Sequence, residues 1–214
     1  DPEERVTKYM ICDPAGSKPW VMIWVAVDEE GVWWVYREWP DSVVGAWALP
    51  HANAKGKPVG KAGPGQRPVG YGYEDYSNLI KDMEKDEDIF ERLVDPRFGK
   101  ATLRAAQGET NICNEMMEHD VFLRPAPGLE IEHGIQKIND LLSWDDTQPK
   151  TWENRPSLYV SEQCDNLIYA MTEYSGSSRE EACKDFIDVL RYGAVTPLDY
   201  VGKGQLAAIG GGGY

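Results

Sequence analysis

Several features that define common protein classes are missing from this chain of 214 residues. No apolar run approaches the length of about 18 residues that a membrane-spanning helix needs, and no segment resembles a signal peptide. The four cysteines show no C-x-x-C spacing, and three of them lie in apolar runs. Buried free thiols in a reducing cytosol are therefore expected in place of disulfides or zinc ligands. The sequence predicts one soluble globular domain with a substantial core.

Histidine and basic residues are also scarce. His51, His119 and His133 lie far from one another and from any Asp or Cys at ligand spacing, so surface or capping roles are expected. Lys and Arg number 22 against 36 Asp and Glu, which gives a formal net charge of −14. Because cations that neutralise phosphates supply most non-specific affinity for DNA, unaided DNA binding is expected to be weak. The acidic excess either holds divalent metal in part or is a solvated surface.

The chain opens with strand-like segments. Residues 6–38 read as three antiparallel strands, and Asp28 to Gly31 forms the second hairpin turn, with the glycine available for positive φ. Aromatic side chains at alternating strand positions usually cover a sheet face, so core packing is expected for the tryptophans of this meander more than base stacking. These are Trp20, Trp24, Trp33, Trp34 and Trp39.

A loop rich in proline and glycine follows, from His51 to Tyr73, and it cannot form the interior of a helix or sheet. It carries four basic residues and no acid before Glu74. Either the loop contacts a DNA backbone or it is a solubilising surface loop. The four are Lys55, Lys57, Lys61 and Arg67.

The remainder alternates helices and short strands. Helices are predicted over residues 73–85, 102–118, 131–144, 165–174 and 179–192, and strands over residues 90–94, 121–123 and 158–160. Three antiparallel strands followed by parallel strands, all flanked by helices, make an α/β protein with a ribonuclease-H-like mixed sheet. In that arrangement the first strand, the fourth strand and the last helix meet at one edge.

Acidic residues occupy those three elements. Asp13 closes the first strand, Asp95 closes the fourth, and Asp185 and Asp188 lie three apart on one face of the last helix. Carboxylates are the oxygen ligands that divalent ions prefer. Two ions roughly 3.5–4 Å apart would stabilise the attacking water and the leaving oxygen of phosphodiester hydrolysis.

The same segments resemble the C-terminal nuclease domain of the large terminase subunit of tailed bacteriophages. The last segment is similar to the D-x-x-D-A-x-R-Y ending of that family, with Val189 where the family often has alanine. The resemblance spans roughly residues 6–193. It is carried, in order, by Ile11–Gly16, Tyr36–Trp39, Leu93–Pro96, Pro156–Val160, Cys164–Ile168 and Asp185–Tyr192.

The resemblance implies a metal-dependent endonuclease that cuts concatemeric viral double-stranded DNA during packaging. Asp13 would bridge two Mg²⁺ or Mn²⁺ ions, Asp95 would hold one, and Asp185 or Asp188 the other. Glu38 is either an outer ligand or the partner of a base such as Arg37. Two further basic residues, Lys100 and Arg104, either neutralise a DNA phosphate or form charge pairs at a helix end.

Such enzymes carry an N-terminal ATPase, and no Gly-Lys-Ser/Thr phosphate loop occurs here, so the chain is expected to be the nuclease part of a longer polypeptide. The other expected partners are the small terminase subunit and the portal protein, in the host cytoplasm. Residues 1–200 are expected to form the nuclease domain and residues 201–214 a flexible glycine-rich tail. The alternatives are another ribonuclease-H-like enzyme, such as a Holliday-junction resolvase or integrase-type enzyme, and a non-catalytic DNA or portal docking module.

Overall fold

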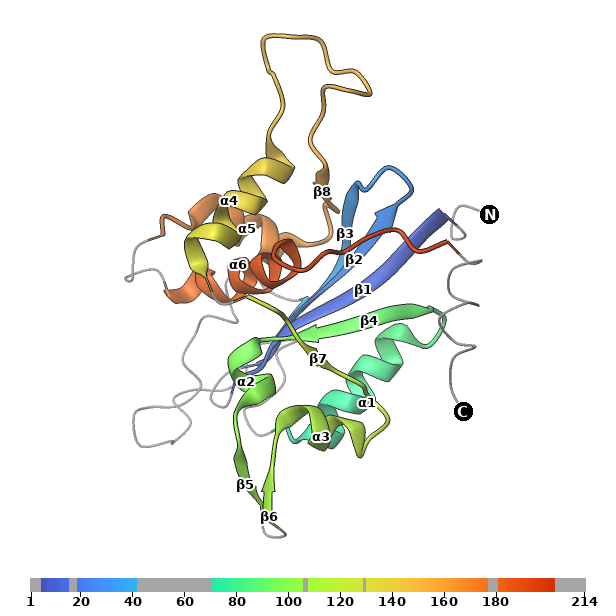
Figure 1. Ribbon diagram of the computed structural model, residues 1–214, viewed down its shortest axis with the longest axis vertical. Coiled ribbons are helices and arrows are strands. Elements are labelled where there is room, and N and C mark those ends of the chain that lie inside the picture. Colours follow the sequence, from blue (N-terminus) through green and yellow to red (C-terminus); the bar gives the residue numbers. More distant parts are fainter. Residues whose placement is uncertain are drawn as a thin grey trace.

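The computed structural model describes residues 5–15, 19–41, 71–105, 108–128, 130–176 and 181–202. Its centre is a six-stranded mixed sheet in the order β7-β4-β1-β2-β3-β8 (Figure 1). Strands β1, β2 and β3 are antiparallel, while β4, β7 and β8 each run parallel to a neighbour. The predicted mixed α/β sheet is confirmed. The strands are β1 Val6–Asp13, β2 Val21–Asp28, β3 Trp33–Trp39, β4 Ile89–Val94, β7 Arg124–Pro125 and β8 Leu158–Val160.

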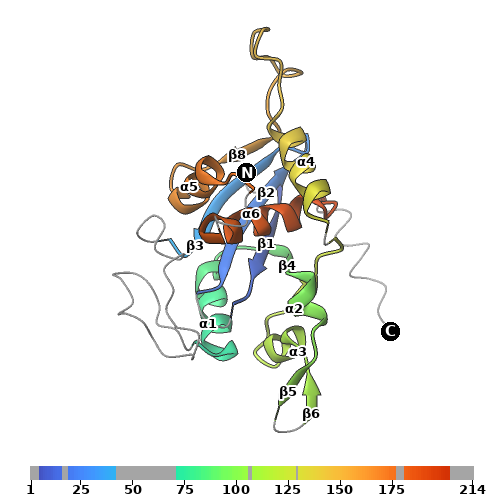
Figure 2. The same cartoon turned by 90° about the vertical axis from the view of Figure 1, so that its left-hand side faces the viewer.

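Helices cover both faces of the sheet (Figure 2). Alternate side chains of β1 enter two separate cores, because successive residues of a strand point to opposite faces. Tyr9 and Ile11 join one core, and Met10 and Cys12 join the other. The first core lies beneath α4 Ile131–Leu142, α5 Asp165–Glu173 and α6 Glu181–Ala194, and the second beneath α1 Tyr73–Glu84 and α3 Ile112–Met117.

Helix α6 lies close against β1. A Cβ atom at Gly193 would stand 2.6 Å from Cδ1 of Ile11, nearer than such atoms approach in proteins. After the helix, the chain runs back along β1, where the Tyr9 hydroxyl donates to the Asp199 carbonyl at 2.7 Å. These contacts fix the height of α6 over the sheet, and with it the position of the acids that α6 carries.

Two predicted elements were wrong. Residues 102–118 form a hairpin, β5 Leu103–Ala105 with β6 Gly108–Thr110, followed by the short helix α3. The side chain of Asn111 caps the start of α3 by accepting the backbone N–H of Asn114. The helix therefore begins only after the hairpin. The strand expected over residues 121–123 begins later, as β7 at residues 124–125. Val121 is not part of the sheet, because its N–H bonds to the Met116 carbonyl at the end of α3.

The tryptophans and cysteines follow the predictions with one exception. Four of the five tryptophans are buried, whereas Trp34 is 41% exposed and stacks on Tyr159 with ring centroids 4.6 Å apart. All four cysteines are free, and only Cys113 is less than fully buried. Within the described ranges, none of the helices is both long and apolar enough to cross a membrane.

Candidate active site

The two strand-borne aspartates leave the sheet at the same edge. Strands β1 and β4 are parallel, Cys12 stands opposite Val94, and the next residues are Asp13 and Asp95. The N–H of Asp95 donates to the Cys12 carbonyl at 3.1 Å, so the pairing continues to the end of both strands. Neighbouring strands lie about 4.8 Å apart. The sheet thus places the two residues side by side where the strands end.

Asp95 begins the short helix α2 Pro96–Lys100. Its Oδ1 accepts the backbone N–H of Arg97 at 2.6 Å, and its Oδ2 accepts Nη2 of Arg97 at 2.9 Å and the Tyr192 hydroxyl at 2.8 Å. Pro96 suits the first helical position because it needs no hydrogen-bond acceptor there. Burial would raise the pKa of Asp95, but the hydrogen bonds from Arg97 and Tyr192 outweigh it and lower that pKa. Asp95 is therefore ionised although it is fully buried.

Helix α6 supplies the other acids. Asp185, Asp188 and Tyr192 are spaced by three and four residues, so they share one face of the helix. Oδ1 of Asp188 accepts Nε of Arg191 at 3.2 Å and Nη2 at 2.9 Å. Both members of this pair are buried. Asp188 is thus held in a fixed orientation by the next turn of its own helix.

The side chain of Tyr192 lies where the three elements meet. Its hydroxyl contacts Asp95, and its pKa is raised first by burial and then by the negative charges of Asp13, Asp188 and Asp95. Charges from β1, β4 and α6 therefore act together at one buried hydroxyl. Asp185, also buried, lies one turn from Asp188 toward the start of α6.

Glu38 does not pair with Arg37, which was one of the two roles that the sequence suggested. Its carboxylate accepts the backbone N–H groups of Asn166 and Leu167, both at 2.8 Å, at the start of α5. Arg37 pairs with Glu87 instead, and the outer-ligand role of Glu38 stays a prediction. Burial raises the pKa of Glu38 to about 7, and the backbone hydrogen bonds only partly offset that rise. Glu38 is thus a helix cap inside the core.

The predicted DNA-binding residues are only partly placed. Lys100 is exposed at the last position of α2, one turn from Asp95. Arg104 lies on β5, so the helix-end pairing considered for it does not apply. The other four lie outside the described residues, and their role stays a prediction: Lys55, Lys57, Lys61 and Arg67.

The candidate ligands fit a divalent ion by chemistry, since they are hard carboxylate oxygens from three elements. In the part of the chain that the structure describes, no three His, Cys, Asp or Glu side chains are already arranged to hold one. Arginine nitrogens instead contact Asp95 and Asp188. A metal would therefore need a rearrangement of side chains at this edge.

Three residues of this site were not predicted: Arg97, Arg191 and Tyr192. The sequence held a signal for each, because Arg97 follows Asp95 by two positions and Arg191-Tyr192 closes the last motif. No sequence pattern pointed to Gly134 on α4, which also belongs to this site. A Cβ atom there would stand 2.1 Å from Cγ of Arg191, so the glycine makes room for the buried arginine.

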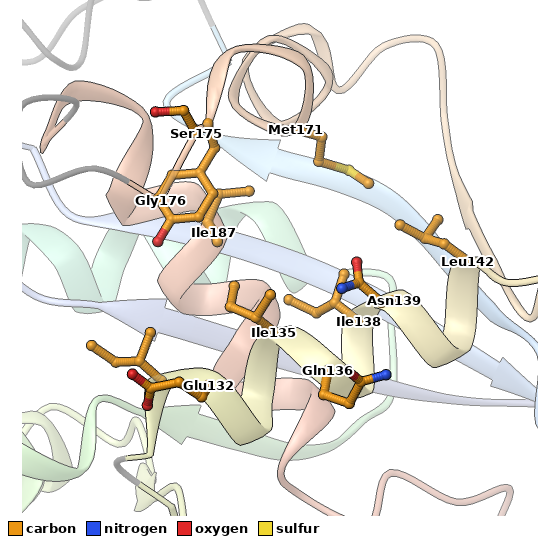
Figure 3. Close-up of a pocket in the computed structure, with 12 residues that line it drawn as sticks. Glu132, Ile135, Gln136, Ile138, Asn139, Leu142, Met171, Ser175, Gly176 and Ile187 are labelled. Carbon is orange, nitrogen blue, oxygen red and sulfur yellow. The ribbon is translucent and has the colours of Figure 1, made fainter.

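A groove elsewhere on the molecule lies among α4, α5 and α6 and has a volume of ≈ 550 Å³ (Figure 3). Ile135, Leu142, Met171 and Ile187 give it aliphatic walls. Glu132 is the only carboxylate among the described residues that line it. The groove thus lacks the paired carboxylates of the sheet edge.

Comparison with known proteins identifies the fold. No family model and no curated protein matches the sequence. Among solved structures, the large terminase from a thermophilic bacteriophage matches in two crystal forms at 14% identity, with TM-scores of 0.55 and 0.57. A third structure of it, in complex with ADP, matches at 15% identity with a TM-score of 0.55. The fold is that of part of a phage large terminase. The matches cover 92–93% of this chain but only 40–44% of the terminase chains, so this chain spans less than half their length.

Proposed function

We propose that this chain is the nuclease part of a terminase large subunit and cleaves concatemeric viral double-stranded DNA with two Mg²⁺ or Mn²⁺ ions. The observation that supports it is geometric: Asp13 and Asp95 follow neighbouring paired strands, and Asp95 accepts the hydroxyl of Tyr192 on α6, the helix that carries Asp185 and Asp188, in a fold like that of phage large terminases. Carboxylates gathered from the ends of separate elements are what a metal-dependent phosphodiesterase requires.

Each residue has a distinct part in this proposal. Asp13, Asp95 and either Asp185 or Asp188 hold the metal. Bound divalent ions supply the activation of water and the stabilisation of charge on the phosphate and the leaving oxygen. Tyr192 fixes Oδ2 of Asp95 through its hydroxyl, and Arg191 fixes Oδ1 of Asp188. Their task is to hold the carboxylates in place, which second-layer hydrogen bonds do at metal sites.

The proposal also includes the partners of a packaging enzyme: an N-terminal ATPase on the same polypeptide, the small terminase subunit and the portal protein, in the host cytoplasm. With a net charge of −14, the chain is expected to rely on such partners to reach DNA. Lys100, Arg104 and the four basic residues of the 51–73 loop are the proposed contacts to the DNA backbone.

Plasmid cleavage tests the proposal. The purified chain should nick and linearise supercoiled plasmid in Mn²⁺ or Mg²⁺, and excess EDTA should abolish this. Asp13→Asn should lose cleavage, whereas Asp28→Asn, at the end of β2, should retain it. Cleavage that persists in EDTA, or that Asp13→Asn leaves intact, rules out the proposed site. A strong preference for four-way junctions over duplex would indicate a resolvase instead.

A further inference from the structure

The two arginines at the acid edge differ in their freedom to move. The side chain of Arg97 is 59% exposed, whereas that of Arg191 is 3% exposed. Arg191 lies over Gly134 of α4, with no space for even one added carbon between them. Arg191 therefore cannot leave Asp188 without disturbing the packing of α4 on α6. Arg97 can turn into solvent without moving any helix.

The guanidinium of Arg97 contacts mainly the Oδ2 atom of Asp95. Its Nε lies 3.2 Å and its Nη2 2.9 Å from Oδ2, and Nη2 is 3.4 Å from the Tyr192 hydroxyl. The guanidinium thus contacts the one Asp95 oxygen that also receives Tyr192. Oδ2 is engaged by side chains alone, whereas Oδ1 also accepts the backbone N–H of Arg97.

We infer that Arg97 is a tethered counter-cation, which a divalent ion must displace from Asp95 before it can bind. This inference rests on the proposed function, because it takes Asp95 as a metal ligand. A buried carboxylate needs a cation or strong hydrogen-bond donors, and a charge-assisted pair with arginine meets that need. A divalent ion and a guanidinium cannot both occupy the coordination positions of Oδ2. The backbone N–H of Arg97 and the Tyr192 hydroxyl remain bound to Asp95 after the side chain has left.

The inference predicts opposite effects of one substitution with and without metal. Arg97→Gln removes the cation, so the variant should melt below the parent in EDTA. Its dissociation constant for Mn²⁺ should fall by about tenfold, because the metal no longer competes with a charged hydrogen-bond partner. Arg97→Lys keeps the charge but loses the planar fork of the guanidinium. Its melting temperature in EDTA and its dissociation constant for Mn²⁺ should lie between those of the parent and of Arg97→Gln.

Thermal melts over a Mn²⁺ titration measure both effects without an assay of cleavage. The matched control is Arg124→Gln, which removes another exposed arginine that contacts a carboxylate, Glu91, through two nitrogens. It should leave the Mn²⁺ dissociation constant of the parent unchanged.

The failure of this inference is distinguishable from the failure of the proposed function. If Mn²⁺ stabilises the parent and Arg97→Gln binds it equally well or more weakly, Arg97 does not compete with metal and the inference is overturned. If Mn²⁺ stabilises neither the parent nor any Arg97 variant, the proposed metal site itself is wrong. If only the variants respond, competition by Arg97 is stronger than tenfold and the inference holds.

Discussion

Buried and half-buried acids occur in two regions of this sheet, and their surroundings differ. On the α1 side, Glu87 accepts hydrogen bonds from Tyr36 and Arg37 and pairs with Lys8. Burial would raise its pKa, but these donors and the charges of Arg37 and Lys8 lower it. Nearby, Glu84 accepts Trp24 at 2.8 Å and Arg92 at 2.6 Å. For Glu87, hydrogen-bond donors and cations thus outweigh the cost of burial.

At the acid edge two acids also have cation partners, Arg97 for Asp95 and Arg191 for Asp188, and the pKa of Asp95 is lowered as that of Glu87 is. What differs is that three carboxylates, those of Asp13, Asp188 and Asp95, act on one hydroxyl, that of Tyr192, and raise its pKa after burial has done so. On the α1 side, by contrast, the cations Lys8, Arg37 and Arg92 outnumber the two carboxylates of Glu84 and Glu87. An accumulation of negative charge is instead what a site for divalent cations requires. The proposed metal site therefore differs from the α1 side in how many carboxylates act on one group, and not in the absence of cations.

The largest expected effect on stability belongs to the α1 side. Glu84→Ala should lower the free energy of unfolding by about 4 kcal/mol, because Arg92 loses its counter-ion and the buried Trp24 indole loses its acceptor. Urea denaturation measures this. Glu91→Ala, which removes the partner of the exposed Arg124, should cost less than about 1 kcal/mol. Equal losses for the two variants would show that the Glu84 pair is no more than a surface ion pair.

Glu38 is an intermediate case, a buried acid held by backbone N–H groups. With the folded pKa raised to about 7 from 4.5, the folded protein binds more protons than the unfolded chain between these values. The contribution of Glu38 to stability is therefore complete below pH 4.5 and falls by about 3 kcal/mol as the pH rises to 7.

Glu38→Gln cannot ionise, so the difference in unfolding free energy between the parent and this variant should shrink by that amount over pH 4.5–7. Urea denaturation at several pH values measures the difference and cancels the titration of other groups. A difference that grows with pH would mean that the helix N-terminus outweighs burial and favours the carboxylate.

The sequence predicted the acid edge because its cause is local. A carboxylate that closes an apolar strand lies at the strand end, and the three-residue spacing of Asp185 and Asp188 places both on one helix face. Most of the sheet followed from the same periodicity. The hairpin β5–β6 was missed because residues 102–118 contain no Pro and their few apolar residues fit a helical spacing equally well.

The partners of these acids depend on contacts that no local pattern records. Glu38 caps a helix that starts more than 120 residues later, and β8 joins the sheet beside β3. In the sequence, Gly134 is only a residue of low helix propensity. The structure shows that it makes room for the side chain of Arg191. Strand order and side-chain pairing are set by the packing of whole elements, so they became visible only in the structure.

The smallest expected effect on stability has the opposite sign and tests the acid edge directly. Like charges that meet at Tyr192 repel one another, at a cost on the order of 1 kcal/mol. Asp13→Asn should therefore melt in EDTA at the same temperature as the parent or above it. Mn²⁺ at a hundredfold excess over its dissociation constant should stabilise the parent by about 2.7 kcal/mol and the variant by much less.

The control for Asp13→Asn is Asp28→Asn at the end of the neighbouring strand. Asp28 accepts the backbone N–H groups of Glu30 and Val32 and the indole of Trp34, so its role is structural. Its replacement should lower the melting temperature and leave the response to Mn²⁺ intact. If Asp13→Asn behaves in that way too, Asp13 supports the fold as Asp28 does, and it is not a ligand of the proposed metal site.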